Sequence, residues 1–261
     1  MYQNTQDNMS NMIQDERKMN IEQLVTNMEA IDKELKGIDG GNFMLFNEQL
    51  DWENLPKLKK CLTNFMPHVN FTQLFDFRSN NCKEYLDVMI DNGVRAIKFH
   101  SYVQEIADSD FSLILDICKE AEKKNISICV DASYGSNRLY DFDNLKLVAY
   151  LSQHIHKSPI VILHSGGARI FDAMLIADAT PNVFLETSFS LEYYKESSLE
   201  KDMLYAYKKI GSDKVIYASD YPAVGTLQES INNQINWLGQ CDFSDTELEK
   251  VFFQNAMRIF Q

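Results

Sequence analysis

Three segments decide the fold that we predict for this chain: AIKFHS (96–101), VILHSGG (161–167) and VIYASDYP (215–222). Each begins as a short apolar strand and ends in charged or imidazole side chains. Parallel α/β barrels present their functional groups in this way, at the carboxyl ends of strands whose other residues pack in the interior. The segments therefore predict a parallel α/β fold with its chemistry at one end of the strands.

The rest of the chain continues this alternation of strand and helix. Apolar segments typical of buried strands lie at 42–47, 70–77, 94–99, 126–130, 160–163, 182–186 and 215–218, and helical patterns lie at 21–35, 82–92, 110–124 and 244–260. His100, Asp131 and His164 are separated by 31 (131 − 100) and 33 (164 − 131) residues, about one βαβ step. No glycine-rich dinucleotide fingerprint follows a strand, so a barrel is favoured over an open nucleotide-binding sheet.

Composition limits the class of protein. With 261 residues and 45% hydrophobic content, the chain can form one well-filled core, which we place at 20–261 after a polar tail or loop at 1–19. A net charge of −13 argues against nucleic acid or an anionic membrane as partner. The five cysteines show no Cys-x-x-Cys spacing, the first residues lack the pattern of a signal peptide, and no apolar run approaches the length of a membrane span. We expect a cytoplasmic protein with reduced thiols and a small-molecule substrate.

Five motifs resemble signatures of the amidohydrolase-related family: AIKFHS, VILHSGG, NVFLETS (182–188), VIYASDYP and the closing FFQNAMRIF (252–260). They resemble strands 4, 6, 7 and 8 and the final helix of that family, in the same order over roughly residues 20 to 261. The resemblance implies a (β/α)8-type TIM barrel of the kind found in metal-dependent hydrolases, lactonases and nonoxidative decarboxylases. It also suggests a homodimer.

The resemblance implies roles for four residues. Asp220 is similar to the aspartate that binds metal and takes a proton from the attacking water, and His164 to a metal ligand or oxyanion donor. Lys98 and His100 lie two apart on one strand, where they would orient an anionic or carbonyl-bearing substrate. Structural interpretations stay open: Asp220 as a turn former, His164 as a strand cap, and Lys98 at the barrel mouth with only His100 inside. The two glycines after His164 would let a substrate approach the backbone.

Two features depart from the family pattern. Asp131 stands where the family has a strand 5 histidine; a carboxylate can replace imidazole as a ligand, so the resemblance still implies a divalent metal, zinc first, at Asp220, His164 and Asp131. No strand ending in His-x-His precedes residue 42. His154 and His156 have that spacing, but they follow a helix, and we predict a surface pair. Glu186, Thr187 and Ser188 are predicted to form a hydrogen-bonded strand end.

We therefore expect a TIM barrel in which the chain begins just after strand 1. Two explanations remain open: a misplaced start codon, or a gene that lacks the strand and leaves edges to be covered by the tail or another subunit. The in-frame DNA upstream of Met1 would distinguish them. The identity of the substrate is expected to depend on the loops at 131–143 and 188–198. Their aromatic side chains either stack on a ring or sugar of the substrate or pack on each other.

Two classes of function follow from these predictions. The first is a hydrolase in which metal-activated water attacks a small carbonyl substrate, with nonoxidative decarboxylation as a variant on the same scaffold. The second is a metal-free, noncatalytic barrel that serves as a binding subunit, which the missing His-x-His and Asp131 favour.

Overall fold

The computed structural model describes residues 37–46, 55–134, 137–221 and 225–260. The predicted tail at 1–19 and the whole predicted helix at 21–35 lie outside these ranges. Residue contacts divide the chain into two compact units, 1–98 and 99–261. The prediction of a single domain at 20–261 stays a prediction, and each unit is described by itself.

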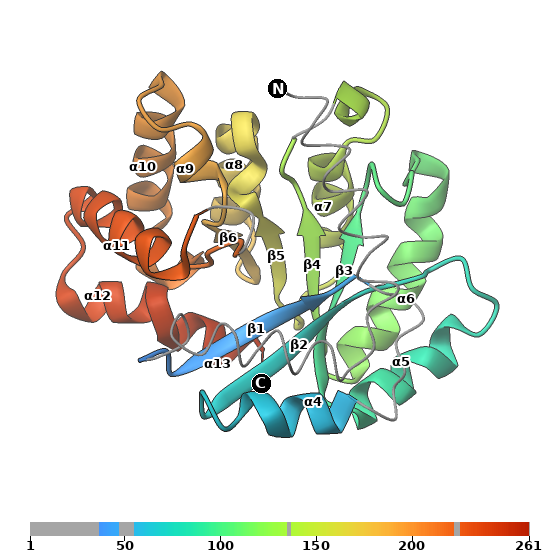
Figure 1. Cartoon of the computed structure of the whole chain (residues 1–261). Helices are drawn as coiled ribbons and strands as arrows, with labels where there is room; N and C mark the ends of the chain where they lie inside the picture. The colour runs from blue at the N-terminus through green and yellow to red at the C-terminus, as the bar shows by residue number, and fades with distance from the viewer. Residues whose placement is uncertain (1–36, 47–54, 135–136, 222–224, 261) are drawn as a thin grey trace. The chain divides into compact units, whose positions relative to one another are not determined.

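The first unit is a short parallel βα arrangement. Its elements are β1 (Gly40–Leu45), α4 (Leu55–Leu62), β2 (His68–Leu74), α5 (Cys82–Asp91) and the start of β3 (Val94–His100). Strand β1 pairs in parallel with β2, the two arrows drawn in blue and teal in Figure 1, and β2 pairs in parallel with β3. The buried faces of α4 and α5 carry leucine and methionine at helical spacing, as the apolar periodicity of 82–92 predicts.

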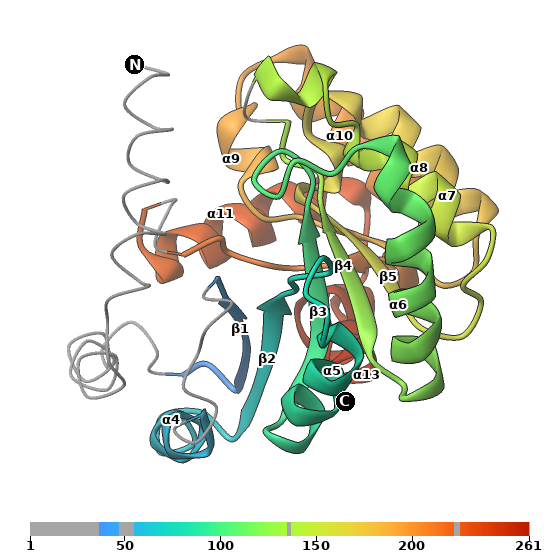
Figure 2. The same cartoon turned by 90° about the vertical axis from the view of Figure 1, so that its right-hand side faces the viewer.

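The second unit continues the pattern from the end of β3. Its strands are β4 (Ser127–Asp131), β5 (Ile160–Leu163), β6 (Val183–Glu186) and β7 (Val215–Ile216), and its helices are α6 (Phe111–Lys123), α7 (Asn144–Ser152), α8 (Ile170–Ala179), α9 (Ser190–Tyr193), α10 (Ser198–Ile210), α11 (Leu227–Leu238), α12 (Asp245–Glu249) and α13 (Asn255–Ile259). Strands β4 to β7 pair in parallel in sequence order. Figure 2 shows α6, α7 and α8 side by side along one face of β4 and β5.

Burial explains why these strands are continuous apolar runs. Every residue of β4, β5 and β6 is buried. Parallel strands with both faces covered lack the polar alternation of half-exposed strands, and this is the pattern that predicted them. Polar side chains in these strands lie largely at the carboxyl ends. The apolar core therefore leaves the strand ends as the place for functional groups.

Several boundaries differ from the prediction. Strand β1 begins two residues before the predicted strand at 42–47, because the backbone of Gly40 and Gly41 pairs with β2. The helix predicted at 244–260 comprises α12, a π-helical segment at Lys250–Gln254 and α13. The last strand is two residues long rather than four.

The remaining predictions about the chain concern its cysteines and membrane spans. All five cysteines are free; four are buried and Cys61 is partly buried. Across the ranges covered by the structure, no helix is both long and apolar enough to cross a membrane.

Candidate active site

Four polar residues of the second unit lie at the carboxyl ends of consecutive strands. His100, Asp131 and Glu186 are the last residues of β3, β4 and β6, and His164 directly follows β5. The spacing of one βαβ step between His100, Asp131 and His164 therefore corresponds to consecutive strand ends, as predicted. Parallel strands bring such ends to one edge of a sheet.

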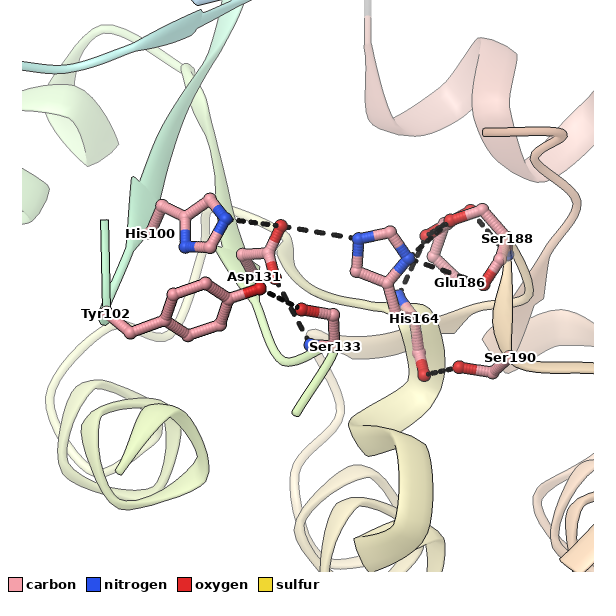
Figure 3. A network of polar contacts seen from close by, with 8 residues as sticks. All are labelled: His100, Tyr102, Asp131, Ser133, His164, Glu186, Ser188 and Ser190. Carbon is pink, nitrogen blue, oxygen red and sulfur yellow. Dashed lines mark hydrogen bonds and ion pairs between the residues drawn. The ribbon is translucent and has the colours of Figure 1, made fainter. Parts of the chain in front are cut away.

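Asp131 joins two histidines. Its Oδ2 atom lies 3.3 Å from Nε2 of His164 and 3.5 Å from Nε2 of His100. The three side chains have exposed fractions of 9%, 3% and 1% for His164, Asp131 and His100. Figure 3 shows the carboxylate between the two rings. A charge held this far from water needs partners, and the histidines supply them.

The other side of Asp131 is fixed by the loop that follows β4. The backbone N–H of Ser133 donates to Asp131 Oδ1 at 3.1 Å, and the Ser133 hydroxyl lies 2.8 Å from the Tyr102 hydroxyl (Figure 3). Tyr102 also packs edge-on against His100, with ring centroids 4.4 Å apart. The carboxylate is thus held in one orientation by groups from two loops.

His164 opens a loop in an uncommon backbone conformation. Residues 164–167 have φ values of 58°, 50°, 79° and 51°, all in the left-handed region. A Cβ on Gly167 would lie 2.7 Å from the Ser133 carbonyl oxygen, and one on Gly166 would lie 2.9 Å from the Ala173 Cβ. Protein atoms therefore fill the space that a side chain would need at both glycines, and the approach of a substrate to their backbone stays a prediction. Strain of this kind persists only where surrounding contacts fix it.

Glu186 and its neighbours supply those contacts. Glu186 Oε2 accepts the backbone N–H of His164 at 3.0 Å and the Ser188 hydroxyl at 2.7 Å, and Oε1 accepts the Ser188 N–H at 2.8 Å. The Ser190 hydroxyl donates to the His164 carbonyl, and the Ser165 hydroxyl donates to the Glu186 carbonyl (2.7 Å). The predicted hydrogen-bonded strand end is confirmed for Glu186 and Ser188.

The electrostatics of the cluster make His164 cationic at neutral pH. Burial lowers the pKa of His164, but the charge and hydrogen bond of Asp131, with the charges of Asp220 and Glu186, outweigh burial and raise this pKa to about 9. Burial also raises the pKa of Glu186, against the opposing effects of His164 and of the hydrogen bonds. A buried imidazolium at a strand end can stabilise negative charge that develops on a substrate.

Comparisons with known proteins agree with this arrangement. The amidohydrolase family model matches residues 72–261, well over half of the chain and all of the strand ends just described. This chain belongs to the amidohydrolase family. No curated protein matches it.

Solved structures add evidence on the fold. An uncharacterised TIM-barrel protein from Bordetella bronchiseptica is 14% identical, with a TM-score of 0.70 over 89% of this chain and 81% of that one. A probable 2-pyrone-4,6-dicarboxylic acid hydrolase from Acinetobacter baumannii, with citric acid bound, is also 14% identical, with a TM-score of 0.63 over 90% and 88%. A 4-oxalomesaconate hydratase from Rhodopseudomonas palustris is 16% identical, with a TM-score of 0.54 over 80% and 69%.

The predicted fold class is therefore confirmed. The structure gives seven parallel strands between residues 40 and 216, and its neighbours include a TIM-barrel protein, so this member of the amidohydrolase family has the TIM-barrel fold with one strand fewer among the described residues. The matching family model describes amidohydrolases, and a probable hydrolase and a hydratase are among the proteins of similar fold.

Asp220 follows β7 in this amidohydrolase as predicted. It is half-buried, lies four residues beyond Ile216 and has a left-handed φ of 56°. Aspartate tolerates this conformation better than most residues, which fits its interpretation as a turn former. Its charge also raises the pKa values of His164 and Tyr102, so it lies within electrostatic reach of the buried network.

Lys98 belongs to the first unit, whereas His100 belongs to the second. The Lys98 side chain is 4% exposed overall, and its ammonium lies 4.6 Å from the centroid of the Phe46 ring. A cation over an aromatic face is stabilised by the ring quadrupole. The predicted contact of Lys98 with substrate stays a prediction.

The implied zinc site can be judged from the separations of its donor atoms. Over the described stretches of the chain, no group of three or more His, Cys, Asp and Glu side chains is placed to hold a metal. Donor atoms bound tetrahedrally to zinc at about 2.0 to 2.1 Å lie about 3.3 Å apart. The separations of Asp131 Oδ2 from Nε2 of His164 and of His100, 3.3 and 3.5 Å, have the size of such a pair as well as of a hydrogen bond. Coordination by Asp220, His164 and Asp131 stays a prediction.

The remaining site predictions concern surface histidines and aromatic loops. His154 and His156 are exposed, as predicted for a surface pair, and His154 Nδ1 lies 2.9 Å from the Tyr150 carbonyl oxygen. In the loop at 188–198, Phe189 stacks on Tyr193 with centroids 4.9 Å apart and presents its edge to His164 at 6.2 Å. The aromatic residues of this loop pack on one another beside the histidine.

Sequence reasoning missed the residues that support the network. Tyr102, Ser133 and Ser190 carry no motif of their own, although all three lie within four residues after a strand end that was singled out. That position beyond a strand end is the signal that could have found them. Their partners could not be read from the sequence, because each contact joins different loops.

Proposed function

We propose that this chain is a hydrolase that acts on a small carbonyl-containing substrate. The observation that carries the proposal is the buried row of His100, Asp131 and His164 at the ends of three consecutive strands. Membership of the amidohydrolase family supports the reaction class. The hydrolase and hydratase among the structural neighbours support a carboxylated substrate.

In the reaction that we propose, Asp220 acts as the general base. Its carboxylate takes a proton from water while the water oxygen bonds to the substrate carbonyl carbon. His164, cationic because Asp131 and the other carboxylates raise its pKa, donates a hydrogen bond to the oxygen that becomes negative. The carbonyl then reforms, the bond to the leaving oxygen or nitrogen breaks, and the proton on Asp220 passes to the leaving group.

His100 completes the proposed site as an orienting residue. Its ring is fixed by Asp131 and Tyr102, and its backbone N–H donates to the Gln104 side chain at 2.9 Å. A fixed ring holds a substrate in one pose better than a mobile one. Lys98 is kept in this role on sequence grounds alone. No step is assigned to a metal; if one binds, Asp131, His164 and Asp220 would hold it, and it would lower the pKa of the attacking water.

A substrate screen tests the proposal. The purified chain is incubated with a panel of small lactones, esters and amides that carry a carboxylate, with and without added zinc. We expect hydrolysis of at least one class and a loss of about 100-fold or more in kcat for Asp220→Asn, whose amide cannot accept the proton. Far-UV circular dichroism controls for folding. Release of carbon dioxide without hydrolysis would favour the decarboxylase instead.

A noncatalytic binding subunit is the second candidate. The features that favour it are Asp131 in place of a histidine and the absence, among the described residues, of three or more side chains placed to hold a metal. In that case the same panel shows binding by calorimetry but no turnover. Elemental analysis of protein purified without chelator would find no bound zinc, manganese or iron, and added metal would not produce activity.

A further inference from the structure

The segment that carries Asp220 is held by side chains rather than by strand pairing. Strand β7 ends at Ile216, and its pairing with β6 ends at the same residue. Asp220 lies four residues further on, where the Ser219 hydroxyl accepts the backbone N–H of Tyr221 at 3.2 Å. Within the described ranges, no hydrogen bond or ion pair holds the Asp220 carboxylate itself. The place of this carboxylate therefore depends on how the backbone before it is fixed.

Ala218, two residues before Asp220, belongs to a closed ring of three hydrogen bonds. Its backbone N–H donates to the Thr187 hydroxyl oxygen at 3.4 Å, and its carbonyl accepts from the Gln234 side-chain amide at 3.0 Å. The Thr187 hydroxyl in turn donates to the Gln234 amide oxygen. Each donor in the ring meets an acceptor, because a hydroxyl can accept one bond while it donates another. Two side chains therefore fix both polar groups of the Ala218 backbone.

Gln234 lies on α11, and its side chain is fully buried. An amide removed from water is destabilising unless its oxygen and its nitrogen both find partners, and a methionine would fill similar space without that requirement. Both partners of Gln234 belong to the ring: the Thr187 hydroxyl, which is also fully buried, and the Ala218 carbonyl. The polar atoms at position 234 therefore serve to hold the chain at Ala218.

The C-terminal helical segments fix β7 and the residue that follows it. The Asn255 side-chain amide, 3% exposed, donates to the Val215 carbonyl oxygen at 2.8 Å. The backbone N–H of Asn255 donates to the carbonyl of Lys250, its π-helical partner, and not to that of Val251, its α-helical one. The Val251 carbonyl accepts the N–H of Tyr217 at 2.9 Å. The π-helical turn thus supplies the bond that a longer strand would have supplied at Tyr217.

We propose that Gln234 is a positioning residue for Asp220: together with Thr187 it fixes the Ala218 peptide and thereby the carboxylate two residues later. A displacement of about 1 Å at a reacting group can cost about 100-fold in rate, even when its cause lies outside the reacting groups. The effect on catalysis rests on the proposed function, in which Asp220 is the general base. The fixing of the Ala218 peptide does not.

Substitutions in the ring test the effect on catalysis. Gln234→Met removes the amide at similar volume, Thr187→Val removes the hydroxyl, and Thr187→Ser keeps it. With a substrate from the screen, Gln234→Met and Thr187→Val should lower kcat per folded molecule about 10- to 100-fold, with much smaller changes in KM. Thr187→Ser should stay within about threefold of wild type. The double variant should be no slower than the slower single variant, because both substitutions open the same ring.

Asn182→Leu is the matched control for the loss of a side-chain amide. Asn182 also donates to backbone carbonyls, those of Ile155 and Ser158 at 3.1 and 2.7 Å, but it directly precedes β6 and so lies at the amino end of that strand. Its substitution should lower the midpoint of urea unfolding and leave kcat unchanged. A similar fall in kcat for Asn182→Leu and Gln234→Met would overturn the proposal, because a general loss of stability would then explain both.

A second measurement reports on the Ala218 peptide without any substrate. Protein labelled with 15N-alanine is transferred to D2O, and the Ala218 amide signal, assigned from an Ala218→Gly variant, is followed by NMR. Exchange at Ala218 should be at least about 10-fold faster in Gln234→Met and Thr187→Val than in wild type. The Ala132 amide, which donates to the Leu163 carbonyl at 3.3 Å, is the internal reference and should not change. Unchanged exchange at Ala218 in both variants would overturn the proposal.

The two measurements distinguish failure of this inference from failure of the proposed function. Faster exchange at Ala218 in a chain that hydrolyses no substrate would count against the hydrolase and support the fixing of Ala218 by Gln234. Hydrolysis by the wild-type chain with unchanged kcat in Gln234→Met and Thr187→Val would count against the positioning role alone.

Discussion

Two glutamates of the second unit, Glu122 and Glu186, each accept three hydrogen bonds, but one lies near the surface and the other is buried. Glu122 accepts the backbone N–H groups of His156, Lys157 and Ser158 at 2.8, 2.7 and 3.4 Å, all on Oε1. Glu186 accepts three donors as well, spread over both oxygens, from His164 and Ser188. Each glutamate joins its own element to a loop more than 20 residues away, yet one borders the surface and the other is 4% exposed.

The difference shows which effect controls the charge. The pKa of Glu122 is lowered, because hydrogen bonds from the loop outweigh its partial burial. The pKa of Glu186 is raised, because burial outweighs equally numerous hydrogen bonds and a neighbouring imidazole. Equal numbers of hydrogen-bond donors therefore do not give the two carboxylates the same pKa shift. The extent of burial decides whether the pKa is raised or lowered. A glutamate that anchors a loop therefore keeps a low pKa at the surface, whereas burial beside a histidine raises the pKa of such a glutamate.

The largest expected effect tests how rigid the loop held by Glu186 is. Gly167 has φ 51° and ψ −125°, and a Cβ there would lie 2.7 Å from the Ser133 carbonyl oxygen. Gly167→Ala should lower the free energy of unfolding by about 3 kcal/mol or more, from backbone strain plus the steric clash. Urea unfolding followed by circular dichroism measures it.

A second glycine provides the control for that substitution. Gly211 also has a positive φ, 82°, but a Cβ there would meet nothing within 4 Å. With ψ 160°, Gly211 lies in a region that is nearly restricted to glycine, so Gly211→Ala should cost about 1 to 3 kcal/mol from backbone strain alone. Equal losses for both alanines would show that the Gly167 loop moves away from Ser133, and that the loop is less firmly fixed than its hydrogen bonds suggest.

The next effect compares the two glutamates directly. In Glu186→Gln one carboxylate oxygen becomes an NH2 group, so at least one buried donor loses its acceptor, because donors occupy both oxygens. We expect a loss of about 1 to 3 kcal/mol in unfolding free energy. Differential scanning calorimetry at neutral pH measures it. A variant as stable as wild type would mean that the loop at 164–167 has other sufficient anchors.

A third effect concerns the hydroxyl that supports the Glu186 backbone. Ser165 Oγ donates to the Glu186 carbonyl and accepts from the Tyr207 hydroxyl at 2.9 Å, with Tyr207 fully buried. Ser165→Ala leaves that hydroxyl without its partner and should cost about 1 to 2 kcal/mol. Tyr207→Phe removes the orphaned group.

The double variant makes this third test specific. If the orphaned hydroxyl causes the loss, Ser165→Ala combined with Tyr207→Phe should be less destabilised than the sum of the single variants. Strict additivity in urea unfolding would show that the Ser165 and Tyr207 hydroxyls do not act together.

The contrast also explains how far the sequence could be read. Strands β4, β5 and β6 were predicted within one residue at each end, because burial on both faces leaves a continuous apolar run that is visible locally. Gly40 and Gly41 lie outside the predicted strand at 42–47 for the converse reason. Glycine adds no apolar side chain to the pattern, and only pairing with β2 places these two residues in the strand.

The positions of the site residues were predicted more accurately than their side-chain contacts. His100, Asp131 and His164 stand at strand ends as expected, since strand spacing fixes them. The sequence suggested Asp131 as a replacement metal ligand but did not show that its carboxylate contacts two imidazoles. The contact between His164 and Glu186 spans 22 residues and depends on a left-handed turn. Local patterns do not encode that turn, so the hydrogen-bond partner of Glu186 at His164 could not be foreseen, although its place in a hydrogen-bonded strand end was.

The smallest expected effect is that of replacing Glu122, the glutamate near the surface. All three loop donors bind Glu122 Oε1, so Glu122→Gln can keep its acceptor as an amide oxygen and loses only the charge. At neutral pH we expect a loss of less than about 1 kcal/mol, because solvent screens this glutamate. The folded pKa of Glu122 is lowered, so its contribution is present above the unfolded value of about 4.3 and disappears as the pH falls through the folded value. The stability difference between wild type and Glu122→Gln should therefore vanish in acid. Urea unfolding across that range checks this, and a difference that persists in strong acid would mean that the glutamine perturbs the loop by its shape rather than by its missing charge.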